Sequence, residues 1–388
     1  MSKIDEYLKD IKVEYLSVDE IFSVKNGYTP SKKNAEYWEN GIIPWFRMED
    51  IRKNGRILDF ALQNVSNSAL KGNLIPASSL IMSTTATLGE YALITVPFLT
   101  NQQITSFSLK DAYIERINIK YLFYSFIDFG KWCKENANQN GGLGIIGLSK
   151  LKKYKFPIPC PDNPEKSLEI QQEIVRILDQ LTDTTNNLKT ELENERQIRK
   201  KQFEFYREVL LSFEGQDMKF FKLGELCKIA SGKNKGRSDN GKYALYGSTG
   251  IIGKTNVKKF DSERILVARV GANAGFAYIV NGEYDVSDNA LVIDKCDNIL
   301  TKYLFYYLFN MNLNQFAKGA GQPLITGTFL KNLIIPIPSL EEQERIVNLL
   351  DQFDAAHTAI EEEIIKEIKL RTQQYEYYRE KLLTFPKN

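Results

Sequence analysis

Apolar residues recur at alternating spacings of three and four in two stretches of the chain, residues 169–213 and 341–385. This heptad pattern predicts two long helices, each with a narrow apolar seam. The two stretches align without a gap at an offset of 172 residues, and 18 of the 45 aligned pairs are identical. Helices with matching seams pair as coiled coils, and a whole domain separates these two, so we expect them to run antiparallel.

The segment before each helix contains the same landmarks in the same order. A short run ending in glutamate is followed seven residues later by glycine, then by a Lys-Tyr-Leu-Phe-Tyr run and finally by Pro-Ile-Pro. The paired landmarks are Leu16–Glu20 and Phe221–Glu225, Gly27 and Gly232, Lys120–Tyr124 and Lys302–Tyr306, and Pro157–Pro159 and Pro336–Pro338. Short β-rich runs bounded by Gly, Pro, Asn and Ser lie between them, and the Lys-Tyr-Leu-Phe-Tyr runs favour amphipathic helices.

These patterns predict an α+β fold with a pseudo-two-fold internal repeat, in which two mixed α/β domains are joined by a pair of long antiparallel coiled-coil helices. Proline ends the extended structure before each helix, and Ser339 with Glu342 fits a helix capping box. We place the first domain at residues 1–161, the first long helix at 167–214, the second domain at 218–338 and the second long helix at 339–385.

The composition excludes few classes of protein. A net charge of +2 neither requires nor rules out nucleic acid, because a basic face can coexist with a balanced total. The four cysteines lie far apart without a Cys-x-x-Cys pair, which argues for a reducing compartment and against a zinc site. No apolar run reaches about 18 residues and no signal peptide is visible, so we expect a soluble, cytoplasmic protein without a membrane partner.

The candidate catalytic motifs are incomplete. Gly247–Thr255 resembles a phosphate-binding P-loop, but Ser248 occupies the position where that loop needs its first glycine. His357, the only histidine, lies on the predicted helix seam, where it has no partners for a catalytic triad or a metal site. We therefore expect a chain that is not an enzyme by itself and that binds no metal.

The loops of both domains instead mix cations, amides, hydroxyls, glycines and aromatic rings. Cations bind phosphates, while Asn, Gln and Arg can hydrogen-bond base edges, so these loops are candidate DNA contacts. In the first domain the candidates are Lys25, Asn26, Tyr28, Lys32, Lys33, Trp45, Arg47, Thr84, Thr85, Asn101, Gln102, Gln103 and Asn140. In the second they are Lys233, Lys235, Arg237, Tyr246, Ser248, Thr249, Lys254, Arg269, Asn273, Asp288, Asn289 and Gln322.

Polar residues of the same type interrupt both helix seams at equivalent positions. Two interpretations are open: the seam rotates there and the residues are solvated, or they form a polar layer that sets the register or docks a partner. The residues are Glu195, Arg199 and Gln202 in the first helix and Glu367, Arg371 and Gln374 in the second.

Together these features resemble the specificity subunit of type I restriction-modification systems over essentially the whole chain. The resemblance is carried by the Pro-Ile-Pro elements and by the helix starts and ends. The helix starts are Gln171–Asp179 and Gln343–Asp351, and the helix ends carry Tyr206-Arg-Glu and Tyr378-Arg-Glu. The run Phe156–Lys166 is similar to the EcoR124-like branch in particular.

The resemblance implies a division of labour. Each domain would be a target recognition domain for one half of a bipartite DNA site, and the helices would set the spacer between the halves. Two modification subunits would supply S-adenosylmethionine and adenine N6-methylation, and restriction or translocase subunits would supply ATP and Mg, so that this chain binds no cofactor. Alternatives are an orphan subunit of a methylation-only system, a coiled-coil protein-interaction scaffold, and a self-sufficient ATPase.

Overall fold

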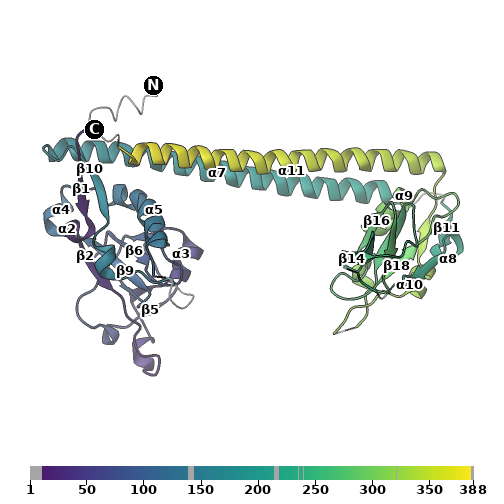
Figure 1. The fold of residues 1–388 in the computed structure, drawn as a ribbon, viewed down its shortest axis with the longest axis horizontal. Coiled ribbons are helices and arrows are strands. Elements are labelled where there is room, and N and C mark those ends of the chain that lie inside the picture. Colours follow the sequence, from purple (N-terminus) through teal and green to yellow (C-terminus); the bar gives the residue numbers. More distant parts are fainter. Residues whose placement is uncertain are drawn as a thin grey trace. The chain divides into compact units, whose positions relative to one another are not determined.

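The computed structural model describes residues 11–138, 144–213, 218–234, 236–238, 240–319 and 321–385. The chain divides into two compact units (Figure 1): Met1–Thr190 with Ile368–Asn388, and Glu191–Glu367. The long helices α7 (Pro164–Leu211) and α11 (Leu340–Leu383) each contribute one part to each unit. Each unit is described by itself below.

The first unit contains three sheets. β1 (Val13–Ser17) pairs antiparallel with β10 (Lys155–Pro159). A five-stranded sheet has the order β2-β9-β6-β7-β4, with β2 at Phe22–Asn26, β9 at Ile104–Leu109, β6 at Ser79–Ser83, β7 at Tyr91–Ile94 and β4 at Ile57–Leu58. A three-stranded sheet has the order β5-β3-β8, with β5 at Asn64–Val65, β3 at Ile43–Phe46 and β8 at Leu99–Thr100.

The second unit repeats this topology. β11 (Phe220–Lys222) pairs antiparallel with β19 (Ile334–Pro336). The larger sheet, β12-β18-β15-β16, has one strand fewer than its counterpart, with β12 at Ile229–Ser231, β18 at Ala290–Ile293, β15 at Arg264–Ala268 and β16 at Ala277–Val280. The smaller sheet is β14-β13-β17, with β14 at Gly250–Thr255, β13 at Tyr243–Gly247 and β17 at Tyr284–Val286.

The correspondence extends to strand direction. The middle strand of each smaller sheet pairs antiparallel on one side and parallel on the other, β3 with β5 and β8, and β13 with β14 and β17. The internal repeat predicted from the long helices is therefore confirmed in the sheets. The remaining helices are α2 (Val18–Ile21), α3 (Met48–Asn54), α4 (Asp111–Ile114), α5 (Ile119–Glu135), α6 (Leu148–Leu151), α8 (Leu223–Leu226), α9 (Thr301–Asn310) and α10 (Gly327–Asn332).

One helix in each unit connects the sheets to the long helices. These helices, α5 and α9, begin with the two Lys-Tyr-Leu-Phe-Tyr runs. The first tyrosine of each run is fully buried, and its hydroxyl donates to the first proline carbonyl of Pro-Ile-Pro: Tyr121 to Pro157 at 2.7 Å and Tyr303 to Pro336 at 3.0 Å. A buried tyrosine needs such a partner, which explains why the tyrosine and the proline element recur together.

The lysine and the second tyrosine of each run bind one carboxylate on a long helix. In the first unit Lys120 Nζ and Tyr124 Oη lie 2.8 and 2.6 Å from the two oxygens of Asp179. In the second, Lys302 and Tyr306 lie 2.6 and 2.7 Å from Asp351. The charge-assisted bonds fix α5 and α9 against the long helices.

A buried glutamine near the start of each long helix makes a second connection. The amide of Gln343 accepts from the Leu300 N–H at 2.9 Å and donates to the carbonyls of Asn298 and Pro338, each at 3.0 Å. Gln171 accepts from the Asn118 N–H at 2.9 Å and donates to the Arg116 carbonyl at 3.2 Å. Both side chains are fully buried, so each backbone group depends on the glutamine for its hydrogen bond.

The depressed pKa of Asp351 makes its bonds to Lys302 and Tyr306, which join α9 to α11, sensitive to acid. Burial raises the pKa of this carboxyl, but the bonds from Lys302 and Tyr306 outweigh burial and hold the pKa below its ordinary value of 3.8. A carboxyl with a depressed folded-state pKa stabilises the fold above its unfolded pKa and loses that contribution as the pH falls.

We expect Asp351→Asn to lower the stability of the protein at neutral pH and to reduce its further loss of stability below about pH 4. Urea denaturation followed by circular dichroism, from about pH 3 to about pH 7, measures both effects. Asp354→Asn, an exposed acid on the same helix, is the matched control. Parallel pH profiles for wild type and Asp351→Asn would contradict the assignment.

The long helices pair antiparallel in both units. In the first unit Thr182 donates to the Tyr375 hydroxyl at 3.3 Å. In the second, Arg196 lies 2.6 Å from Glu361, and Tyr206 stacks on Phe353 with ring centroids 5.1 Å apart. Partner numbers on α11 thus fall as those on α7 rise, as predicted from the seams. Heptad spacing places Val209 on the seam of α7, but this residue is 53% exposed, whereas Leu211 is buried in the core.

The structure also bears on the P-loop resemblance and on the spacing of the cysteines. Gly247–Thr255 forms a β-hairpin between β13 and β14, without the helix that a P-loop requires. Cys227 and Cys296 form a disulfide although 69 positions separate them. Wide spacing in the sequence therefore did not prevent these two cysteines from meeting in the fold. None of the helices in the described ranges combines the length and apolarity needed to cross a lipid bilayer.

Candidate nucleic-acid interface

A glycine marks the same point in both units, immediately after the first strand of the larger sheet. A Cβ on Gly27 would lie 2.1 Å from the Thr100 hydroxyl, and one on Gly232 would lie 2.1 Å from the Ser287 carbonyl oxygen. Glycine is therefore required for backbone contact at both positions. The candidate loops of each unit begin at this glycine, where the chain passes close to a neighbouring strand.

In the first unit, hydrogen bonds bring several candidate residues together beside Gly27. Thr105 bonds both Asn26 and Thr84, at 2.8 and 3.0 Å. Thr29 donates to Gln102, and the Gln103 N–H donates to Asn101 at 3.1 Å. The polar candidates of β2, β6 and the β8–β9 turn thus form one cluster, in which Asn26, Gln102 and Gln103 remain exposed.

Two first-unit candidates are buried and two are half-buried. Trp45 is 4% exposed and donates to the Tyr28 carbonyl, and Thr84 is 6% exposed, so we withdraw both as DNA contacts. Tyr28 is half-buried, with its hydroxyl bonded to the Ala69 carbonyl. Thr85 is also half-buried, and its hydroxyl finds no hydrogen-bond partner within the described part of the chain.

Cations adjoin this cluster along the chain. Lys25, Lys32 and Lys33 are exposed, and no ion pair links them to another described residue. The Arg47 guanidinium lies over the Trp45 ring and 3.4 Å from Glu49, and its Nε has no hydrogen-bond partner among residues of known placement. Unpaired cations beside amides and hydroxyls are the chemistry that phosphate and base edges require. Asn140 lies outside the described residues.

In the second unit, six candidates lie where the β13–β14 hairpin approaches the β17–β18 turn. Ser248 Oγ donates to the Asn289 carbonyl at 2.6 Å, and the Asn273 amide lies 3.5 Å from the Ser248 carbonyl. The Arg269 guanidinium lies 3.4 Å from the Asp288 carbonyl. Thr249, Asn273 and Asn289 are exposed, whereas Ser248, Arg269 and Asp288 are half-buried.

Three exposed cations adjoin this surface, Arg237 and Lys254 at β14 and Lys233 beside β17. The Ser238 N–H donates to the Lys254 carbonyl at 2.9 Å, and the Arg237 side chain lies against Gly253, so that Arg237 and Lys254 are neighbours. The Lys233 N–H bonds the Val286 carbonyl. Within the described residues none of these cations has an acidic partner. Tyr246 is half-buried against Tyr284, Gln322 is exposed, and Lys235 lies outside the described residues.

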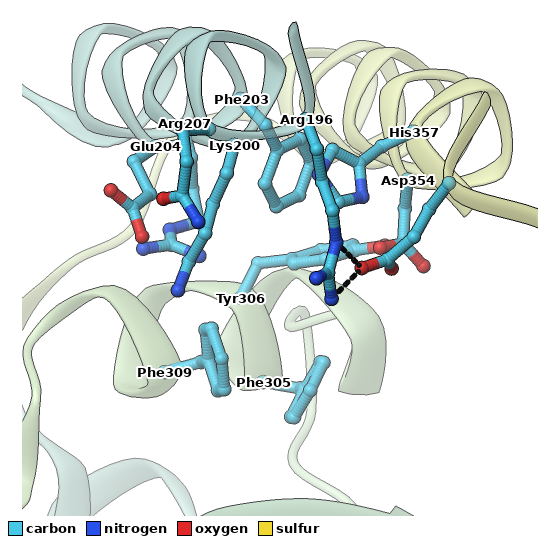
Figure 2. Close-up of a pocket in the computed structure, with 12 residues that line it drawn as sticks. Arg196, Lys200, Phe203, Glu204, Arg207, Phe305, Tyr306, Phe309, Asp354 and His357 are labelled. Atoms are coloured by element: carbon cyan, nitrogen blue, oxygen red, sulfur yellow. Dashed lines mark hydrogen bonds and ion pairs between the residues drawn. The ribbon is translucent and has the colours of Figure 1, made fainter. Parts of the chain in front are cut away.

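The second unit also contains a cleft of about 650 Å³ between α9 and the long helices (Figure 2). Arg207 of α7 projects into it, 4.9 Å above the Phe309 ring, with Nε bonded to Asn310 at 3.0 Å. Burial lowers the pKa of this guanidinium, which has no ion pair with a described residue. His357 lies beside Phe203 on the long-helix side of the cleft, with ring centroids 5.8 Å apart. In the first unit a smaller cleft of about 390 Å³ lies between α5 and the long helices.

Of the polar residues that interrupt the seams, four are exposed and two are half-buried: Arg199, Gln202, Arg371 and Gln374 are exposed, and Glu195 and Glu367 are half-buried. Glu195 accepts from Arg199 at 2.7 Å, and Arg199 donates to Gln202 at 3.2 Å, all along α7. Arg371 likewise donates to Gln374 at 2.9 Å on α11, and Glu367 is half-buried. One polar bond that crosses between the helices in the second unit joins Arg196 to Glu361, and the sequence argument missed it because neither residue repeats.

Arg207 was also missed, although it could have been found. It repeats as Arg379 in the two Tyr-Arg-Glu runs. In the first unit Arg379 is 5% exposed, and its Nε has no hydrogen-bond partner among the residues described. The identity across the repeat signalled a structural or functional role, but only the fold shows that one guanidinium lines a cleft and the other is buried.

Comparisons with known proteins agree on one family. The family model described as type I restriction modification DNA specificity domain matches residues 11–195 and again 215–370. The EcoprrI specificity subunit of a type I restriction enzyme from Escherichia coli is 40% identical over 372 residues, covering 93% of this chain and 92% of that protein. The EcoR124I/EcoR124II specificity subunit, also from Escherichia coli, is 28% identical over 420 residues, covering 100% and 98%.

Solved structures show the same fold. A chain from a study of the assembly and conformational transition of the type I R-M system superposes with a TM-score of 0.78 at 15% identity, covering 96% of this chain and 97% of that one. The HsdS subunit from Thermoanaerobacter tengcongensis gives 0.61 at 16% identity, covering 96% of both. With its duplicated α+β units, repeated helices and two matches to the family model, the chain belongs to the specificity subunits of type I restriction-modification systems.

Proposed function

We propose that this chain is the non-catalytic DNA-recognition component of a cytoplasmic type I restriction-modification complex. Each globular domain contacts one half of a bipartite DNA site, and the helices α7 and α11 set the unspecified spacer. The observation that carries the proposal is the duplication of one fold, with a polar cluster flanked by unpaired cations at the same topological position in each copy. The side chains differ between the clusters, as two different half-sites would require.

Each cluster supplies both parts of DNA recognition. Lys25, Lys32 and Lys33 in one unit, and Lys233, Arg237 and Lys254 in the other, are available to phosphates, which provide affinity without sequence preference. Exposed amides such as Asn26, Gln103 and Asn289 have the donor and acceptor pairs that contact base edges. Gly27 and Gly232 bring the backbone close to the neighbouring strands at the edge of each cluster.

The modification subunits dock on the helices in this proposal. Ile198, Phe205 and Val209 are 59%, 59% and 53% exposed at spacings of seven and four, so they share one face of α7. Leu370 and Tyr377, the equivalents of Ile198 and Phe205, are 49% and 57% exposed on α11. Glu195, Arg199 and Gln202 border the first stripe, and Arg371 and Gln374 the second. Two equivalent stripes suit two copies of one partner.

These partners bring the chemistry. In the proposal S-adenosylmethionine binds the modification subunits, while ATP and Mg bind the restriction or translocase subunits. This chain contributes recognition, spacing and docking surfaces. Within the described residues no group of three or more His, Cys, Asp or Glu side chains could hold a metal ion.

Long-read methylation mapping tests the function. We compare a host that carries this gene and its methyltransferase partner with a strain that lacks this gene alone. Loss of one bipartite N6-methyladenine motif is the expected result, and it identifies both half-sites. An unchanged methylome contradicts the recognition role and favours the protein scaffold. Methylation without restriction of unmodified DNA identifies a methylation-only system.

A charged side chain in the α7 stripe should weaken docking. We expect Ile198→Lys combined with Phe205→Lys to lower affinity for the modification subunit by roughly 10- to 100-fold, because both changes place a charge in a desolvated interface. Size-exclusion chromatography with light scattering measures the assembly. Gln197→Lys, about 100° round the helix, is the control. Unchanged assembly of the double variant would place docking elsewhere.

A further inference from the structure

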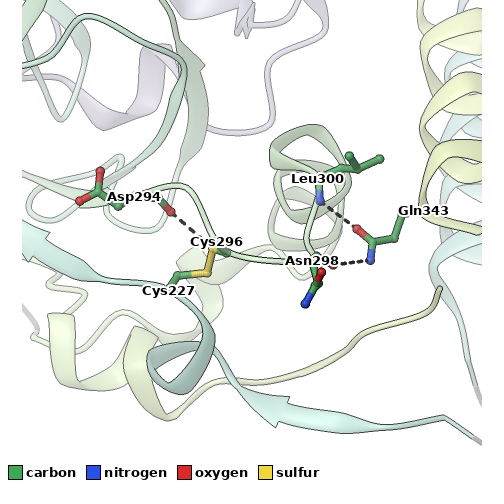
Figure 3. Close-up of a disulfide and its surroundings, with 6 residues drawn as sticks. All are labelled: Cys227, Asp294, Cys296, Asn298, Leu300 and Gln343. Atoms are coloured by element: carbon green, nitrogen blue, oxygen red, sulfur yellow. Dashed lines mark hydrogen bonds between the residues drawn. A yellow bond between two sulfur atoms is a disulfide. The ribbon is translucent and has the colours of Figure 1, made fainter. Parts of the chain in front are cut away.

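The disulfide crosslinks a junction that both units possess, but at which only the second unit has a pair of cysteines. Cys227 ends α8, and Cys296 belongs to the loop that leads into α9 (Figure 3). Their Cα atoms are 4.7 Å apart, within the normal range for a disulfide. Cys227 is 5% exposed within the hydrophobic core, whereas Cys296 is half-buried, with its sulfur 3.4 Å from the Asp294 carbonyl. The sulfur pair is therefore covered on one side and reachable on the other.

The loop from 294 to 300 is held at three points. Arg264 forms an ion pair with Asp294, Cys296 is crosslinked, and Gln343 bonds the Asn298 carbonyl and the Leu300 N–H (Figure 3). The loop thus connects β18, which borders the candidate DNA surface, with α9 and α11. Forming or breaking the disulfide therefore acts on the attachment between the sheet that contains β18 and the long helix α11.

The first unit has the same junction without sulfur. Phe22 follows α2 as Cys227 follows α8, and each donates its N–H to the first residue of its helix. Ile114 precedes Asn118 by four residues, as Cys296 precedes Leu300, and Gln171 holds Asn118 as Gln343 holds Leu300. Phe22 is 1% exposed and Ile114 is 58% exposed. This junction is held without a disulfide, by packing, by the glutamine and by hydrogen bonds from Lys110 to the Ile21 and Asp19 carbonyls, so the crosslink is an addition to the second unit.

We propose that Cys227 and Cys296 form a redox-responsive crosslink that stabilises the second recognition domain selectively. Disulfides in a reducing cytoplasm are mostly transient or redox-sensing rather than structural, and this argument rests on the cytoplasmic location of the proposed function. A low-molecular-weight disulfide oxidises the pair: the two protein S–H bonds and the reagent S–S bond break, the protein S–S bond forms, and two small thiols leave. A dithiol reverses the reaction and is itself oxidised to a cyclic disulfide.

Thiol counting tests the chemistry without DNA or partner subunits. We treat the purified full chain with oxidised glutathione or reduced dithiothreitol, remove the reagent, denature the protein and titrate thiols with an aromatic disulfide reagent. Two thiols per chain are expected after oxidation, from Cys133 and Cys160, and four after reduction. A matched Cys160→Ser variant should show one and three. Four thiols in both states of the wild type would overturn the proposal.

Hydrogen exchange tests the selectivity. Reduction should accelerate amide exchange roughly tenfold or more in peptides covering residues 223–231 and 294–300, because opening a long closed loop restores chain entropy to the unfolded segment. Peptides covering residues 18–26 and 112–118 are the internal control and should not change. The thermal transition followed by tryptophan fluorescence should also stay constant, since Trp38, Trp45 and Trp132 all lie in the first unit.

Two variants separate the crosslink from simple damage to the core. Cys296→Ser should reproduce the exchange of the reduced wild type and become insensitive to dithiothreitol, while Cys133→Ser should keep the response. Equal exchange in oxidised and reduced wild type would refute selective stabilisation even if the disulfide forms. An unchanged methylome would not alter the expected thiol counts or exchange rates, so the two proposals can be refuted independently.

Discussion

Replacing residues 218–338 with the equivalent segment of another family member is expected to change one half of the recognised DNA sequence and leave the other half unchanged. The second unit contains its own sheets, its own polar cluster and its own hydrophobic core. The first-unit cluster depends on contacts such as Thr105 with Asn26 and Thr84, which the exchange does not touch. Methylome sequencing of a host that carries the chimaera with the native methyltransferase measures both halves.

The junctions of the chimaera follow the structure. Pro336 must be kept or supplied by the donor, because its carbonyl accepts from the buried Tyr303 hydroxyl. A donor segment should also carry the Lys-x-x-x-Tyr pair that binds Asp351. Re-inserting the native segment by the same cloning route is the control. A change in both half-sites would contradict two independently recognising domains.

Gln343→Ala is expected to destabilise the second unit by about 3 kcal/mol. The substitution leaves the Leu300 N–H and the carbonyls of Asn298 and Pro338 without their partner in a buried environment, and each unsatisfied buried group costs about 1–3 kcal/mol. The neighbouring Glu344 is exposed, so Glu344→Ala should change stability by less than about 0.5 kcal/mol. Hydrogen exchange of second-unit peptides measures the loss.

The repeat supplies an internal check on this prediction. Gln171→Ala should destabilise the first unit through the Asn118 N–H and the Arg116 carbonyl, and tryptophan fluorescence reports that unit selectively. If Gln343→Ala exchanged like wild type in peptides around Leu300, water would be replacing the glutamine and the connection would be dispensable.

The long helices and the repeat could be predicted from sequence because their signals are local and periodic. A seam such as Leu178 and Leu350, both fully buried, follows from heptad spacing alone. The repeated landmarks could also be read from the sequence, but their structural role could not. Tyr121 and Pro157 recur in order along the chain, yet only folding shows that one donates a hydrogen bond to the other.

The candidate DNA surface was predicted less well than the fold. Residue type and loop position selected Trp45 and Thr84, which the structure buries, beside Asn26 and Gln103, which it exposes. Burial depends on which strands cover a side chain, and that pairing joins residues far apart in sequence. The same limit concealed Arg207, whose cleft is formed by α7, α9 and α11 together.

The sequence by itself determined the two-fold repetition, the antiparallel helices and the family, because each follows from spacing or identity between segments. Only the tertiary structure decided which polar residues are accessible, which cysteines meet and how each domain is attached to its helix. Asp179, Asp351, Gln171 and Gln343 make that attachment through partners 43 to 59 positions away. Contacts over such separations depend on the closed fold, and no local pattern encodes them.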